Sequence, residues 1–114
     1  MPDAFVIDPR ADARATAAWN PQKMGKATLF NGAHLLAGLN AFEPGQEHAA
    51  HVHAATDKLY QVVEGTGQFT VGAESRTLST GALIFAPADV PHSVRNLGPS
   101  RLLILVVIAP PPRK

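Results

Sequence analysis

The stretch from Gly45 to Gly65 constrains the fold of this chain more than any other. It reads GQEHAAHVHAATDKLYQVVEG and places His51 and His53 two residues apart, just before β-branched and aromatic residues that end at a glycine turn. Such a run predicts a strand over residues 58–64. Because side chains alternate between the faces of a strand, a strand that begins early enough to include both histidines points both rings to one face. Two imidazoles on one face can share a metal ion.

A third imidazole comes from the stretch Gly81 to Asn96, which reads GALIFAPADVPHSVRN. An apolar run leads into a turn bounded by two prolines, and His92 stands where the next strand should begin. In a small antiparallel barrel the two stretches can lie side by side, and His92 then completes a three-histidine set. Three histidines without cysteine suit Fe, Ni, Cu, Mn or Zn about equally well. We therefore expect a divalent transition metal whose identity stays open.

The two stretches resemble the two motifs of the cupin family. Positions of the first motif are matched by Gly45, His51, His53 and Gly65. Positions of the second motif are matched by Gly81, Pro87, His92 and Asn96, with Asp89 replacing a glycine. Two spaced motifs in the right order are a specific signal. The resemblance implies an all-β fold, the double-stranded β-helix or jelly-roll cupin barrel, with flanking strands from about Leu29 to Ile108.

The chain departs from the first motif at its glutamate, which in the family serves as a fourth protein ligand of the metal. Lys58 stands at that position, and the nearest carboxylate is Asp57. A protonated lysine has no lone pair and cannot replace the ligand. Asp57 lies on the opposite strand face unless a bulge turns it inward. We favour a site of three histidines with open coordination positions, and keep Asp57 as the less favoured fourth ligand.

Strand alternation points Lys58, Tyr60 and Val62 into the barrel. Lys58 can hold an anionic substrate beside the metal, and Tyr60 can donate a hydrogen bond to it, so both are candidate catalytic residues. The alternative for Lys58 is a salt bridge at the barrel rim, with Glu47, Glu64 or Asp57 as its partner. The alternative for Tyr60 is core packing. His48 lies outside the motif spacing, and we expect it in a loop facing water.

The rest of the chain predicts one domain of 114 residues, with an N-terminal arm over 1–25, the barrel over 26–110 and a tail over 111–114. Ten basic and nine acidic residues are scattered along the chain, which gives no footprint for nucleic acid or a membrane surface. No segment resembles a signal peptide or a membrane span, and there are no cysteines. We expect a cytoplasmic protein.

The last apolar run, Leu102 to Ala109, is apolar on both faces, whereas a strand with one wet face should alternate. Its outer face needs a cover. The N-terminal arm or a second sheet layer can provide one, but a homodimer interface is the preferred explanation. Trp19, near the end of the arm, is expected to anchor packing.

Two classes of function remain open because fold alone does not decide function. The first is a metal-dependent enzyme, such as a small dioxygenase, isomerase or lyase, that acts on a small oxygen-rich anionic compound through an ion that polarises a substrate oxygen. Cupins that this chain resembles include such enzymes. The second is a non-catalytic module that binds or senses a small molecule, with or without metal.

Overall fold

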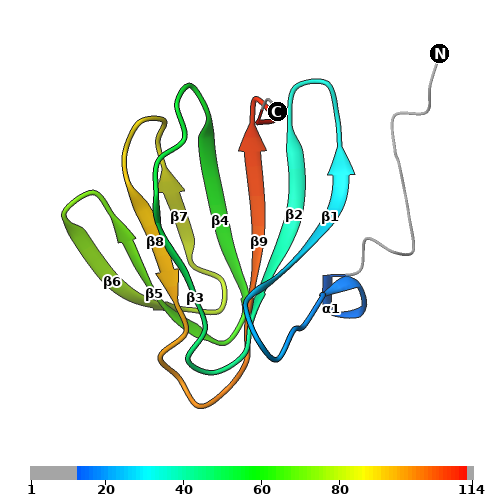
Figure 1. Ribbon diagram of the computed structural model, residues 1–114, viewed down its shortest axis with the longest axis vertical. Helices are drawn as coiled ribbons and strands as arrows, with labels where there is room; N and C mark the ends of the chain where they lie inside the picture. Colours follow the sequence, from blue (N-terminus) through cyan, green and yellow to red (C-terminus); the bar gives the residue numbers. More distant parts are fainter. Residues whose placement is uncertain (1–12, 113–114) are drawn as a thin grey trace.

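The structure is a computed structural model that describes residues 13–112, and its regular elements in that range are one short helix and nine strands (Figure 1). In chain order these elements are α1 (Ala13–Thr16), β1 (Gly25–Asn31), β2 (Leu36–Phe42), β3 (Glu47–His51), β4 (Asp57–Glu64), β5 (Thr66–Val71), β6 (Glu74–Ser79), β7 (Leu83–Ala86), β8 (His92–Arg95) and β9 (Leu102–Ala109).

The strands form two antiparallel sheets. One sheet has the strand order β1-β2-β9-β4-β7, and the other has the order β3-β8-β5-β6. The chain crosses repeatedly from one sheet to the other, so that β3 and β8, from the two histidine stretches, become neighbours. The predicted all-β jelly-roll barrel is confirmed.

The core lies between the sheets and follows strand alternation. In β4, Lys58, Tyr60 and Val62 are 4%, 1% and 1% exposed, while Leu59 is 40% exposed. The predicted inward face of this strand is therefore confirmed. The buried apolar side chains that fill the barrel are Phe42, Tyr60, Val62, Phe69, Ile84, Ala86, Val94, Leu102, Ile104 and Val106.

A second, smaller cluster lies on the outer face of the five-stranded sheet. Leu39, Ala41 and Leu103 are buried there against Ala17 and Trp19 from the segment that precedes β1. The predicted anchoring role of Trp19 is confirmed, and the Arg101 guanidinium lies 4.4 Å from the centre of its ring. The described part of the N-terminal arm thus covers the first residues of β9 on their outer side. Residues 1–12 and 113–114, at the two predicted ends, lie outside the described range.

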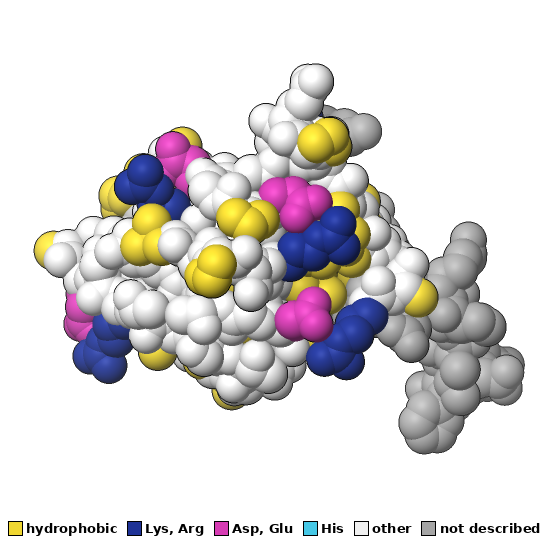
Figure 2. Space-filling view, turned by 90° about the horizontal axis from the view of Figure 1, so that it is seen from below, with side chains coloured by type: hydrophobic (Ala, Val, Ile, Leu, Met, Phe, Trp, Pro, Cys, Tyr) yellow, Lys and Arg dark blue, Asp and Glu magenta, His cyan; other side chains and the backbone are white. Residues whose placement is uncertain are grey.

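The two ends of the barrel differ in chemistry. In Figure 1, β4 and β8 begin at the upper end of the barrel. Figure 2 shows the lower end, where acidic and basic side chains lie next to one another and no histidine is visible. Arg101, for example, pairs with Glu43 at 3.0 Å, and Arg14 with Glu64 at 3.7 Å. Within residues 13–112, no helix has the length and apolar character needed to cross a membrane.

Candidate metal centre

The strand pairing of β3 with β8 brings the histidines together. His51, the last residue of β3, pairs directly with His92, the first residue of β8. His53 follows two residues later in the loop before β4. The strand over residues 57–64 does not begin early enough to include the histidines, because the chain turns at Ala55, whose φ of 59° is left-handed. The predicted meeting of all three rings is confirmed.

The three rings converge closely enough to share one ion. One ring nitrogen from each of His51, His53 and His92 lies within 4.8 Å of the others. The ring centres of His51 and His92 are 4.1 Å apart, those of His51 and His53 are 4.9 Å apart, and those of His53 and His92 are 5.9 Å apart. These distances suit a cluster of nitrogen ligands around a divalent transition metal.

In two of these rings, a hydrogen bond to a backbone carbonyl determines which ring nitrogen is free to bind a metal. His51 Nδ1 donates to the Ala49 carbonyl at 2.8 Å, and His92 Nδ1 donates to the Val90 carbonyl at 3.0 Å. A carbonyl can only accept, so the proton sits on Nδ1 and the Nε2 lone pair is available. His92 Nε2 is buried and has no hydrogen-bond partner within the described part of the chain. An unpaired buried nitrogen is costly, and a metal ion would pair with it.

Burial keeps the histidines neutral. It lowers the pKa of His51 to about 4 and also lowers the pKa values of His53 and His92, with the nearby Lys58 charge acting in the same direction. Metal binding requires a deprotonated imidazole. The three rings therefore hold their ligand lone pairs ready at neutral pH.

Lys58 lies against this cluster from β4. Its Nζ donates to His51 Nε2 at 3.3 Å and lies 5.5 Å from the centre of the Tyr60 ring. Burial is the main reason that its pKa falls to about 8, and the charge of Lys26 contributes. Neither lysine has an ion pair within residues 13–112, so the alternative of a rim salt bridge for Lys58 is not observed there.

Tyr60 is the second predicted catalytic residue, and it lies deeper in the barrel. Its ring centre is 5.9 Å from that of Phe69 and 6.3 Å from that of His92. Its hydroxyl is buried without a hydrogen-bond partner among the described residues, and burial raises its pKa. Tyr60 therefore contributes to core packing and also offers an unused donor close to the histidines.

His48 is a residue that sequence reasoning misplaced. The expectation of a water-facing loop is wrong, because His48 belongs to β3 and its ring stacks on His51 at 4.1 Å. Burial lowers its pKa to about 3, and its Nδ1 is buried without a partner among the described residues. The segment from His48 to His51 in β3 lies opposite the segment from His92 to Val94 in β8, which is one residue shorter. β3 therefore carries one extra residue, a β-bulge. The bulge lets residues three apart share a face.

Asp57 serves the loop before His92 instead of the metal cluster. Its Oδ1 accepts a hydrogen bond from the Ala88 backbone NH at 2.9 Å, on the outward side of β4. Asp89, which replaces the motif glycine, has a φ of 67°, a left-handed conformation that glycine favours and aspartate tolerates. Its backbone NH donates to the His53 carbonyl at 3.0 Å. The contact between Asp89 and His53 connects the loop before His92 to the loop that contains His53.

The three imidazoles fit a metal ion, but Lys58 competes with the ion for one of them. Three neutral imidazoles converge, and the nitrogen of His92 lacks any other partner among the described residues. Three protein ligands leave positions for water or substrate. Lys58, however, donates to the same His51 nitrogen that an ion would use. The ion and this ammonium therefore compete for one lone pair.

The fold and the histidine cluster together define a class, the double-stranded β-helix proteins with a histidine centre at one mouth of the barrel. Residues 38–108 match the family described as Cupin domain. The chain belongs to the cupin family.

The chain is also similar to individual proteins, among them the following three. An uncharacterized protein of Streptomyces coelicolor is 35% identical over 74 residues, which are 65% of this chain and 69% of that protein. A crystal structure from Thermus thermophilus has a TM-score of 0.86 and 44% identity, and the match covers 89% of this chain and 96% of that one. An oxalate-binding protein of Thermotoga maritima is 27% identical over 85 residues, which are 75% of this chain and 69% of that protein.

Proposed function

We propose that this cupin is a metal-dependent enzyme that acts on a small oxygen-rich anionic compound, in a reaction of the dioxygenase, isomerase or lyase type. His51, His53 and His92 hold a divalent transition metal (Fe, Ni, Mn, Zn or Cu), which supplies Lewis acidity toward a substrate oxygen. The observation that carries the proposal is the meeting of three neutral imidazoles beside a buried ammonium that lacks a carboxylate partner among the described residues.

Lys58 and Tyr60 are the chain's own contribution to the chemistry. The ammonium of Lys58 is buried, and an anionic substrate group offers it the counter-charge that the described residues do not. Charge on a substrate oxygen is stabilised most effectively by donors already fixed in a dry site. The buried hydroxyl of Tyr60 is such a donor. The similarity to an oxalate-binding protein supports a small oxygen-rich anion as the ligand.

A second candidate, a binding or sensing module that works without metal, is favoured by one observation. The bond from Lys58 Nζ to His51 Nε2 gives the cluster an internal partner that requires no ion. In such a module the same ammonium still binds an anion, but nothing polarises it toward reaction.

Elemental analysis of the protein purified from metal-replete cells tests the proposal. We expect about one transition metal per chain in the wild type and its loss in His92→Gln. His34→Gln is the matched control, since His34 is exposed and lies outside the cluster. A wild-type protein with no stoichiometric metal, or a His92→Gln variant that keeps its metal, would overturn the enzyme proposal. Tight retention of a small anion by metal-free protein would then favour the module.

A further inference from the structure

A cavity of about 210 Å³ adjoins the histidine cluster inside the barrel. It is lined by Lys58 and His48, which both contact the His51 ring. Other side chains around it come from β1, β2 and β9, and they include Lys26, Thr28, Asn40, Val106 and Ile108. A ligand bound at the histidines can thus extend toward β1.

The far side of this cavity carries a second cation. Lys26 of β1 pairs with the 6% exposed Asn40 of β2, so its side chain starts on the cavity side of the sheet. Lys26 lines the same cavity as Lys58 and His48, and its side chain is exposed to solvent. Like Lys58, it forms no ion pair within residues 13–112.

Lys58 is buried and Lys26 is exposed, and their two like charges at one small cavity repel each other, so an anion between them is attracted by both. The chain as a whole has a formal charge of only +1, so this concentration of positive charge is local. The cavity therefore selects for negative charge at two separate points.

The volume of the cavity limits the ligand. A water molecule occupies about 30 Å³ of liquid, so 210 Å³ holds roughly seven waters. A short chain with an acidic group at each end fits this space, whereas a nucleotide does not. Val106 and Ile108 on the wall contact the apolar middle of such a chain.

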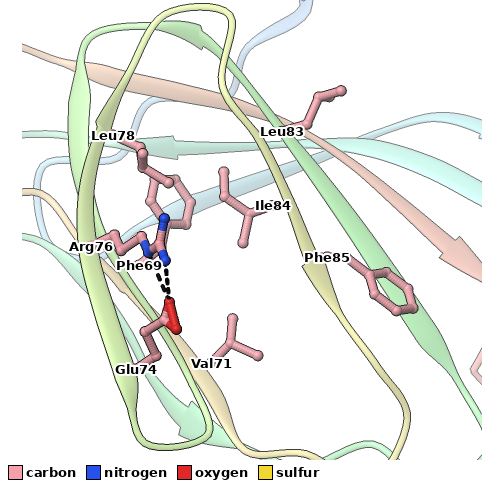
Figure 3. Close-up of a pocket in the computed structure, with 8 residues that line it drawn as sticks. All are labelled: Phe69, Val71, Glu74, Arg76, Leu78, Leu83, Ile84 and Phe85. Carbon is pink, nitrogen blue, oxygen red and sulfur yellow. Dashed lines mark hydrogen bonds and ion pairs between the residues drawn. The ribbon is translucent and has the colours of Figure 1, made fainter.

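A pocket at the other edge of the barrel offers no such selection. It has a volume of about 400 Å³ and lies between the β5–β6 hairpin and β7 (Figure 3). Its charged residues, Arg76 and Glu74, are paired with each other at 2.7 Å. Neutralised in this way, they leave the pocket without a free charge to choose an anion.

We propose that Lys26 is a specificity-determining residue that binds a second acidic group of the substrate, so that the substrate class is a small dianion such as a short dicarboxylate. This inference rests on the proposed function, in which the first acidic group lies at Lys58 and the histidines. It adds a second anchoring point, supplied by β1, that sets the length and the charge of the ligand.

Calorimetric titration of the protein as purified tests the inference. The probes are malonate and succinate, each compared at constant ionic strength with its own monomethyl ester, which has nearly the same shape and one charge less. We expect the wild type to bind a diacid roughly tenfold or more tightly than its ester, the scale of a hydrogen bond to a charged group. Lys26→Met should lose this preference and keep its affinity for the ester, while Lys26→Arg should retain the preference.

Lys23→Met is the matched control, since Lys23 is an exposed lysine of the same segment that does not line the cavity. Metal content and thermal unfolding, measured on each variant, should match those of the wild type. If Lys26→Met keeps the preference for the diacid, or weakens acid and ester equally, Lys26 is not the second anchor and the proposed function still stands. If the wild type binds neither acid nor ester, the anion site of the proposed function is wrong as well.

Discussion

Lys58 occupies the one motif position where cupins of this pattern place a carboxylate, and the exchange reverses the charge beside the histidines. Its Nζ lies 3.3 Å from His51 Nε2, and Lys58 is buried while His51 is half-buried. A cation at this position opposes a metal ion and attracts an anion at the same time. We therefore expect Lys58 to lower the affinity for a metal ion and to raise the affinity for an anionic ligand.

The first prediction concerns the effect of Lys58 on metal affinity. Lys58→Glu should raise metal affinity by roughly 10- to 100-fold, the range by which neighbours of metal ligands usually alter binding. The reason is that the competing donor is removed and a ligand oxygen is added. Competition with a chromophoric chelator measures the affinity. The neutral variant Lys58→Met should fall between the wild type and Lys58→Glu. Equal affinities in all three proteins would show that Lys58 does not compete with the ion.

At the scale of the strands, features that depend on local sequence pattern were easier to predict than features that depend on which strands pair. Alternation in β4 was predictable, because a half-buried strand shows it directly, and the pairing of His51 with His92 followed from motif spacing. The place of His48 was not predictable, since it depends on a bulge that appears only when β3 pairs with β8. The position of Lys26 beside the cavity was missed for a similar reason. Its strand lies at a sheet edge, and only the pairing with β2 decides which face points inward.

The outer face of the five-stranded sheet bears on the expected homodimer. Phe85, Leu59 and Val107 are directly paired neighbours on β7, β4 and β9, and they form an apolar row across the sheet. Phe85 is 56% exposed and Leu59 40% exposed, and the described part of the arm packs on a different region, around Leu103. An uncharged flat row can match a second copy of itself across a two-fold axis. We propose that the protein forms a homodimer through this row.

This dimer gives the second prediction. Leu59→Glu should weaken dimerisation at least tenfold, because it buries an unpaired carboxylate in the interface. Sedimentation velocity over a range of concentrations measures the change. Leu97→Glu is the control, since Leu97 is also exposed but lies in the loop between β8 and β9. A wild-type protein that sediments as a monomer, or equal weakening by both variants, would contradict an interface at this row.

At the scale of the whole molecule, the ion-paired side chains of the described residues lie away from the histidine cluster. The ion pairs of the described residues join Arg14 to Glu64, Arg101 to Glu43 and Arg76 to Glu74, and none of these residues lies in the histidine cluster or lines the cavity beside it. Lys58, Lys26 and His48, which line that cavity, have no acidic partners among the described residues. Lys58 is the desolvated charge of this set, and burial of the apolar core offsets its cost. We therefore expect the stability of the fold to depend on protonation at this end of the barrel.

The last prediction follows from this dependence and concerns the metal-free protein. Burial lowers the pKa of His48 from 6.5 to about 3 and that of His51 from 6.5 to about 4. Between these values and 6.5 the unfolded chain binds protons that the folded chain does not, so the free energy of unfolding should fall as the pH drops from 6.5 toward 4. For Lys58, whose pKa falls from 10.5 to about 8, the free energy should rise as the pH increases from 8 to 10.5.

Urea denaturation of chelator-treated protein at a series of pH values measures both slopes. His48→Gln should flatten the acidic slope in part, because one of the histidines that stay neutral in the fold is removed, and it should leave the alkaline slope unchanged. Lys58→Met should remove the alkaline slope. If the wild type is equally stable at pH 6.5 and pH 4.5, the histidines are not held neutral by the fold. The rings would then lack the ready lone pairs on which metal binding at this centre depends, because protonated imidazoles cannot act as ligands.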